Sequence, residues 1–198
     1  YKEAKATIAT LEAGEDSMDP KYKAKYYYLK GAAYGKSNVS KAADAYNKLF
    51  AYEKEIGKNK YTKIAKPKLT ELIEFVSSKA VEQYNAKDYK AAKDNFYLTY
   101  KLSPVDTTYL YNAAISASLA KDYDTSLKHY RKLEEIKYTG ITTQYFAVNK
   151  ASGEKENLGT KANRNTMVKF GKYNSPTEVT SVSKHAEIVK NISYILIN

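Results

Sequence analysis

Two segments of the chain carry the same residue pattern 34 positions apart. Residues 88–96 have the sequence DYKAAKDNF and residues 122–130 have the sequence DYDTSLKHY. In both, an Asp-Tyr pair precedes a small residue and then an aromatic residue. Apolar residues around both segments recur at three- and four-residue steps, which indicates helices. A fixed period of this length predicts a stack of two-helix units.

The pattern resembles the second helix of the tetratricopeptide repeat (TPR). Pro104 stands where that family ends its unit, and a proline there stops a helix because it lacks the amide donor. A further second helix is predicted around Ala42 and Tyr46, after a first helix that contains Gly31. The resemblance implies a mainly α protein, a TPR-type α-α superhelix. The small residues Ala42, Ala92 and Ser126 would then lie where two helices cross closely.

The same resemblance divides the chain into three parts. Residues 1–137 are predicted to be TPR-like helical repeats: a partial repeat at 1–13 and repeats at about 21–57, 68–104 and 107–137. Within them, the lysine-rich Gly57–Pro67 segment is predicted to be a link, with a long first helix starting at Lys68. Residues 177–198 are predicted to be the first helix of a further, truncated repeat. We expect both ends to be cut from a longer array.

Between the repeats, residues 138–176 lose the helical period. Thr142–Val148 is aromatic and β-branched, as strands are, and Lys150–Gly153 can form a turn. With Glu154–Gly159 as the returning strand, the segment predicts a small inserted β-hairpin, while Lys161–Phe170 is predicted to be a short helix or a third strand. Residues 138–154 resemble an insertion in envelope-located TPR proteins of Gram-negative bacteria. That resemblance implies a periplasmic or cell-envelope location, with the cytoplasm as the alternative.

Motifs for catalysis, metals and cofactors are missing from the sequence. The chain has no cysteine and only His129 and His185, and it has no glycine-rich phosphate loop or hydrolase motif. We therefore expect no enzyme activity, no cofactor and no metal site. His129 is predicted to lie on the exposed side of a second helix. No run of apolar residues is long enough to span a membrane.

The formal charge of +11 comes from lysine, since Arg131 and Arg164 are the only arginines. This balance argues against base-specific reading of nucleic acid, for which arginine is the usual residue. The densest run is Lys58, Lys60, Lys63, Lys66 and Lys68. One interpretation is a solvated linker. The other is a docking surface for an acidic partner or an anionic polymer.

In the TPR family the first helices line a concave surface that binds ligands. Carrying that register over residue by residue gives a predicted groove formed by Lys25, Tyr28, Glu74, Ser77, Tyr84, Thr108, Tyr111, Asn112, Ile115, Lys190, Asn191 and Tyr194. Its mixed aromatic and polar character suits a peptide. The resemblance thus implies a scaffold for protein–protein interaction that binds a peptide or protein segment. The alternatives are a basic-surface binder of an envelope polymer or nucleic-acid backbone, and a docking or regulatory segment of a larger enzyme.

Overall fold

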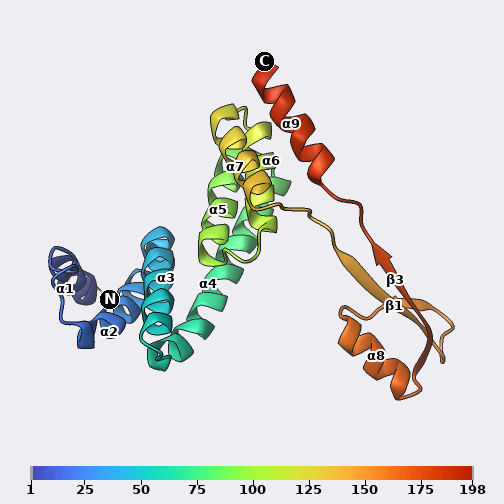
Figure 1. The fold of residues 1–198 in the computed structure, drawn as a ribbon, viewed down its shortest axis with the longest axis horizontal. Helices are drawn as coiled ribbons and strands as arrows, with labels where there is room; N and C mark the ends of the chain where they lie inside the picture. The colour runs from blue at the N-terminus through green and yellow to red at the C-terminus, as the bar shows by residue number, and fades with distance from the viewer. Residues whose placement is uncertain (1, 198) are drawn as a thin grey trace. The chain divides into compact units, whose positions relative to one another are not determined.

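The computed structural model describes residues 2–197, which are mainly helical with one small antiparallel sheet (Figure 1). The mainly α class is thereby confirmed. The chain divides into two compact units, Tyr1–Leu133 and Glu134–Asn198. The elements of the first unit are α1 (Lys2–Glu12), α2 (Pro20–Tyr34), the short 3₁₀ helix η1 (Gly35–Ser37), α3 (Val39–Glu55), α4 (Lys60–Asn85), α5 (Tyr89–Leu102), α6 (Thr108–Leu119) and most of α7 (Tyr123–Glu135).

Helices α2 to α7 form three consecutive helical hairpins, each with a first helix (α2, α4, α6) and a second helix (α3, α5, α7). The side chains of Asn38, Asp88 and Asp122 start the second helices by accepting hydrogen bonds from the amides three residues later. The turns before α5 and α7 also match, since Lys87 and Lys121 both adopt left-handed backbone conformations, with φ of 61° and 60°. The 34-residue period is therefore also a period of the backbone.

The helices of each hairpin cross closely at the small residues. Ala42, Ala92 and Ser126 are fully buried, as predicted. The Ser126 hydroxyl donates a hydrogen bond of 3.0 Å to the Ala114 carbonyl on the facing helix. At the α2–α3 crossing, a Cβ added to Gly31 would lie only 2.5 Å from the Tyr46 ring, so glycine is required there.

Helix α4 begins earlier than the sequence predicts. Gly57–Pro67 was expected to be a link, but α4 starts at Lys60 and contains Pro67. The reason is Glu53 on α3, whose buried carboxylate accepts hydrogen bonds from the amides of Tyr61 (3.0 Å) and Thr62 (2.7 Å). These amides have no partner within the helix. Burial raises the pKa of the Glu53 carboxyl, but the two amides outweigh it, and the pKa is lowered overall.

His129 is buried, contrary to the prediction that it is exposed. Its imidazole stacks on the ring of Tyr97 from α5, with the ring centres 4.6 Å apart. Burial lowers the pKa of His129 to about 4, and the nearby charges of Lys128 and Lys93 act in the same direction. The imidazole is therefore neutral at pH 7 and serves as a packing group between α5 and α7.

The second unit contains a three-stranded sheet, where the sequence predicts a two-stranded hairpin. Strands β1 (Thr143–Asn149), β2 (Lys155–Asn157) and β3 (Tyr173–Thr180) pair antiparallel in the order β2-β1-β3. The predicted short helix is α8 (Lys161–Lys169), and α9 (His185–Ile197) follows the sheet. The insertion was predicted to end at residue 176, but Pro176 lies inside β3, which continues to Thr180. Strand β3 is at the edge of the sheet, where proline is tolerated.

Arg164 fixes α8 to the sheet. Its side chain is buried, donates to the Thr177 carbonyl at 3.3 Å and forms an ion pair of 3.1 Å with Glu178, both on β3. The guanidinium also lies over the ring of Tyr145 on β1, 5.4 Å from the ring centre. One residue of α8 therefore contacts two strands.

Replacing Gly31 with alanine should destabilise the first unit. The new Cβ has to displace the buried Tyr46 ring, and such overpacking costs about 1–3 kcal/mol. Urea denaturation measures the free energy of unfolding. Gly14→Ala is the control, because its Cβ would meet no atom closer than 3.9 Å, and its change should stay within about 0.5 kcal/mol. The close crossing would be contradicted if Gly31→Ala and Gly14→Ala lowered the free energy of unfolding equally. It would also be contradicted if Gly31→Ala caused the same loss of stability in a Tyr46→Leu background.

The buried His129 should make the protein less stable in mild acid. An unfolded chain binds a proton at this histidine near pH 6.5, while the folded chain binds it only near pH 4. Stability should therefore fall as the pH drops from about 6.5 to about 4. Urea denaturation of His129→Phe should show a weaker fall than the parent protein. His185→Asn, at an exposed position, should keep the parent's pH dependence; identical profiles for all three would disprove the burial of His129.

Candidate functional site

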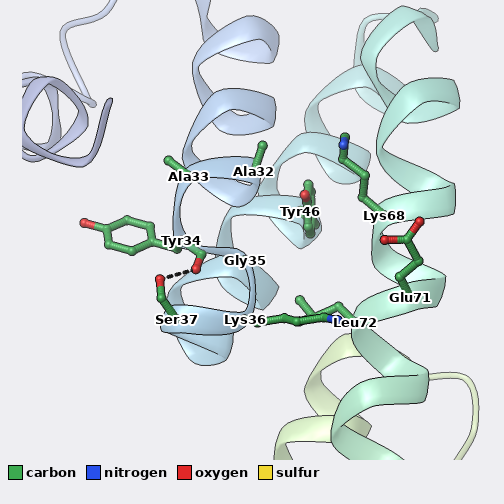
Figure 2. Close-up of a pocket in the computed structure, with 10 residues that line it drawn as sticks. All are labelled: Ala32, Ala33, Tyr34, Gly35, Lys36, Ser37, Tyr46, Lys68, Glu71 and Leu72. Atoms are coloured by element: carbon green, nitrogen blue, oxygen red, sulfur yellow. Dashed lines mark hydrogen bonds between the residues drawn. The ribbon is translucent and has the colours of Figure 1, made fainter. Parts of the chain in front are cut away.

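Successive hairpins leave a pocket between their first helices. Between α2 and α4 lies a cavity of about 410 Å³ that also includes η1, with Tyr46 of α3 between the two walls (Figure 2). We name it the α2–α4 pocket. It is lined by Ala32, Ala33, Tyr34, Gly35, Lys36, Ser37, Tyr46, Lys68, Glu71 and Leu72.

A second pocket, the α4–α6 pocket, has the same plan. Its volume is about 240 Å³, and its walls are Val81 and Tyr84 of α4 and Asn112 and Ile115 of α6. Phe96 of α5 takes the place that Tyr46 has in the first pocket. Tyr84 packs edge-on against Phe96, with the ring centres 6.3 Å apart. An aromatic side chain from a second helix therefore backs both pockets.

The two pockets differ in chemistry. The α4–α6 pocket has a single amide, Asn112, among apolar and aromatic residues. The α2–α4 pocket carries Lys36, Lys68 and Glu71 around the phenol of Tyr46. Burial raises the pKa of Tyr46 to about 12, with Tyr28 and Glu71 adding to the shift. The Tyr46 hydroxyl therefore keeps its proton at neutral pH and is available as a hydrogen-bond donor.

A third cavity, of about 610 Å³, lies between α1 and α2. It is lined by apolar side chains such as Ile8, Leu11 and Leu29, and by Lys25. Salt bridges tie the end of α1 and the turn after it to the next helices. Lys30 on α2 contacts Glu12 at 3.1 Å and Glu15 at 3.0 Å, and further pairs involve Lys41 and Lys48 of α3.

The structure brings together three residues of the predicted groove, Tyr84, Asn112 and Ile115, in the α4–α6 pocket. The other predicted residues lie elsewhere. Lys25 lines the cavity beside α1, and Tyr28 packs on Tyr61 with the ring centres 5.7 Å apart. Ser77 is half-buried, Glu74 and Thr108 are exposed, Tyr111 is buried, and Lys190, Asn191 and Tyr194 lie on α9 in the second unit.

Sequence reasoning missed most of the α2–α4 pocket. The sequence predicts that Lys68 starts a first helix and belongs to a run of exposed lysines, and that Tyr46 packs between units. It assigns no role to Lys36 or Glu71. The reason is that the pocket is formed by residues of α2, η1, α3 and α4, and the sequence pattern does not show that Lys68 and Glu71 lie opposite α2. A signal was present in Tyr46 itself, because a buried aromatic residue with a hydroxyl requires a polar neighbour or an opening.

No protein-family model, no curated protein and no solved structure matches this chain. Within residues 2–197, no helix combines the length and the apolar character that a bilayer crossing requires. The described residues also include no cluster of three or more His, Cys, Asp or Glu side chains suited to a metal ion. The lysines at positions 58, 60, 63, 66 and 68 are all exposed, and those from Lys60 onward lie on α4.

Proposed function

We propose that this chain is a non-catalytic scaffold of the TPR type that binds a segment of a partner protein along its first helices, α2, α4 and α6. The observation that carries the proposal is the repeated pocket. Two cavities of the same plan open between successive first helices, each with an aromatic residue at its back.

The lining of the pockets suits side chains of a peptide. Aromatic and aliphatic groups give contact area with little rotamer entropy to lose, while a few polar groups select the orientation. In an extended peptide every second side chain points the same way, so one segment can fill successive pockets. The three consecutive hairpins and the turn repeated after 34 residues support the TPR type of scaffold.

A second candidate function is binding of an anionic polymer through the lysines of α4. The exposure of Lys60, Lys63, Lys66 and Lys68 favours it. Attraction to a polyanion depends on counterion release and falls steeply as salt rises. Binding in the pockets depends mainly on buried contacts and should fall much less. Salt dependence therefore separates the two functions.

A displayed library of random peptides, selected against the full chain, tests the proposed function. Selected peptides should lose at least about tenfold in affinity, measured by fluorescence anisotropy, when Asn112 and Ile115 are both changed to alanine. The apolar contact and the amide of the α4–α6 pocket are then gone. Lys79→Ala and Lys90→Ala are controls, because both lysines are exposed and line neither pocket.

Two outcomes would contradict the proposal. One is that no peptide is selected. The other is that binding survives the pocket variant, disappears on changing Lys60, Lys63 and Lys66 to alanine, and falls steeply with salt. That second result would establish the anionic-polymer function instead.

A further inference from the structure

We propose that the α2–α4 pocket is a carboxylate site that takes the side chain of an Asp or Glu residue of the bound segment. That the carboxylate belongs to a bound protein segment rests on the proposed function. The site itself rests on the groups that line the pocket.

The first of these groups is the Tyr46 hydroxyl. The side chain is only 2% exposed, yet it lines the pocket, and among the described residues its hydroxyl has no hydrogen-bond partner. The hydroxyl is not among the buried atoms of residues 2–197 that lack a partner, so it opens into the pocket as a donor with no protein acceptor. An oxygen of a bound ligand could accept this hydrogen bond. Figure 2 shows the ring between the walls formed by α2 and α4.

The second group of observations concerns charge. Lys36 reaches the pocket from η1 and Lys68 from α4, and neither forms an ion pair with a carboxylate of the described residues. The ammonium group of Lys36 lies over the ring of Phe75, 4.8 Å from its centre, which keeps the side chain close to α4. Glu71 is the one acidic residue of the lining. The lining therefore carries one net positive charge, which matches one carboxylate.

Glu71 also has a role in selecting the ligand. Burial is the main cause of the raised pKa of Tyr46, and the negative charge of Glu71 adds to it, so the protonated phenol offers a donor to an acceptor group. The same charge repels anions, and the two lysines have to outweigh that repulsion. Removing Glu71 should therefore strengthen the binding of a carboxylate, while removing a lysine should weaken it.

Gly35 is part of the pocket lining at the turn between α2 and η1. It lines the cavity with φ of 39°, a conformation that favours glycine, and a Cβ added there would meet no atom within 4 Å. The backbone between α2 and η1 therefore turns without placing a side chain in the opening.

A titration with small probes tests the site without any partner protein. The full chain, with ¹³C-labelled tyrosine rings, is titrated with N-acetyl-glutamate-methylamide and, in parallel, with the neutral N-acetyl-glutamine-methylamide. Tyr46→Phe identifies the Tyr46 signals and leaves the ring packing in place. The glutamate probe should shift these signals in a saturable way at millimolar concentration, and the glutamine probe should bind at least about threefold more weakly.

Three charge variants make the test specific. Lys36→Ala and Lys68→Ala should each weaken binding of the glutamate probe by about two- to fivefold, as expected for partly exposed ion pairs. Glu71→Gln should tighten it by a similar factor, and Lys79→Ala should leave it unchanged. The sign reversal between the Lys68 and Glu71 variants, on one helix, cannot come from a general loss of structure.

The carboxylate site is overturned if the Tyr46 signals show no saturable shift, if both probes bind alike, or if Glu71→Gln weakens binding. The last result would indicate a ligand that donates to Glu71. Each result is independent of the peptide selection. A chain that selects peptides but ignores the glutamate probe retains the proposed function without this site, and the reverse result retains the site alone.

Discussion

The close crossing of α2 and α3 at Gly31 is the constraint on which the first pocket depends. Because Gly31 has no side chain, the Tyr46 ring can pack directly against the backbone of α2. A Cβ at position 31 would lie only 2.5 Å from the nearest atom of that ring. The ring therefore passes beneath α2 and reaches the space between α2 and α4, where it lines the pocket. A larger residue at position 31 would push Tyr46 out and change both the hairpin and the pocket. The stability of the hairpin and the shape of the pocket thus depend on the same contact.

The other hairpins use the same arrangement with different residues, and the chemistry changes with them. The residue facing the crossing is Ala80 in the α4–α5 hairpin, and the aromatic residue there is Phe96. Phenylalanine brings no hydroxyl, so the α4–α6 pocket is apolar apart from Asn112. In the α6–α7 hairpin Ser126 meets the Ala114 carbonyl, and its hydroxyl is used inside the crossing. One backbone plan therefore presents a polar pocket and then an apolar pocket. Under the proposed function, that order would let the chain recognise the order of residues in a bound segment.

Local patterns predicted the helices and the hairpins, because their period, their Asp and Asn caps and their small crossing residues are all visible in the sequence. The features that could not be predicted depend on contacts between residues distant in the chain. In one case a local signal, Pro67, also pointed to a different structure. The start of α4 is set by Glu53 on the preceding helix, and Pro67 gave the opposite local signal. His129 looked exposed, since its partner Tyr97 lies one helix away. The candidate pocket was missed for the same reason, as Lys36, Tyr46 and Lys68 come from three elements.

The lysines of α4 and the α2–α4 pocket belong to one electrostatic arrangement. Lys60 and Lys63 lie in the first turns of α4, where the helix dipole makes cations unfavourable, and Glu53 is the carboxylate that compensates at that end. Such a placement lowers helix stability, and local rules are commonly broken at functional sites. Exposed lysines attract an acidic segment over a distance of about 10 Å and speed its association, but they do not select its sequence. Selection would come from the pocket two turns further along the same helix, where Tyr46 and Lys68 meet a single carboxylate. Under the proposed function, the exposed lysines would add a salt-dependent attraction to the association of an acidic segment, while the buried contacts in the pockets would keep it bound.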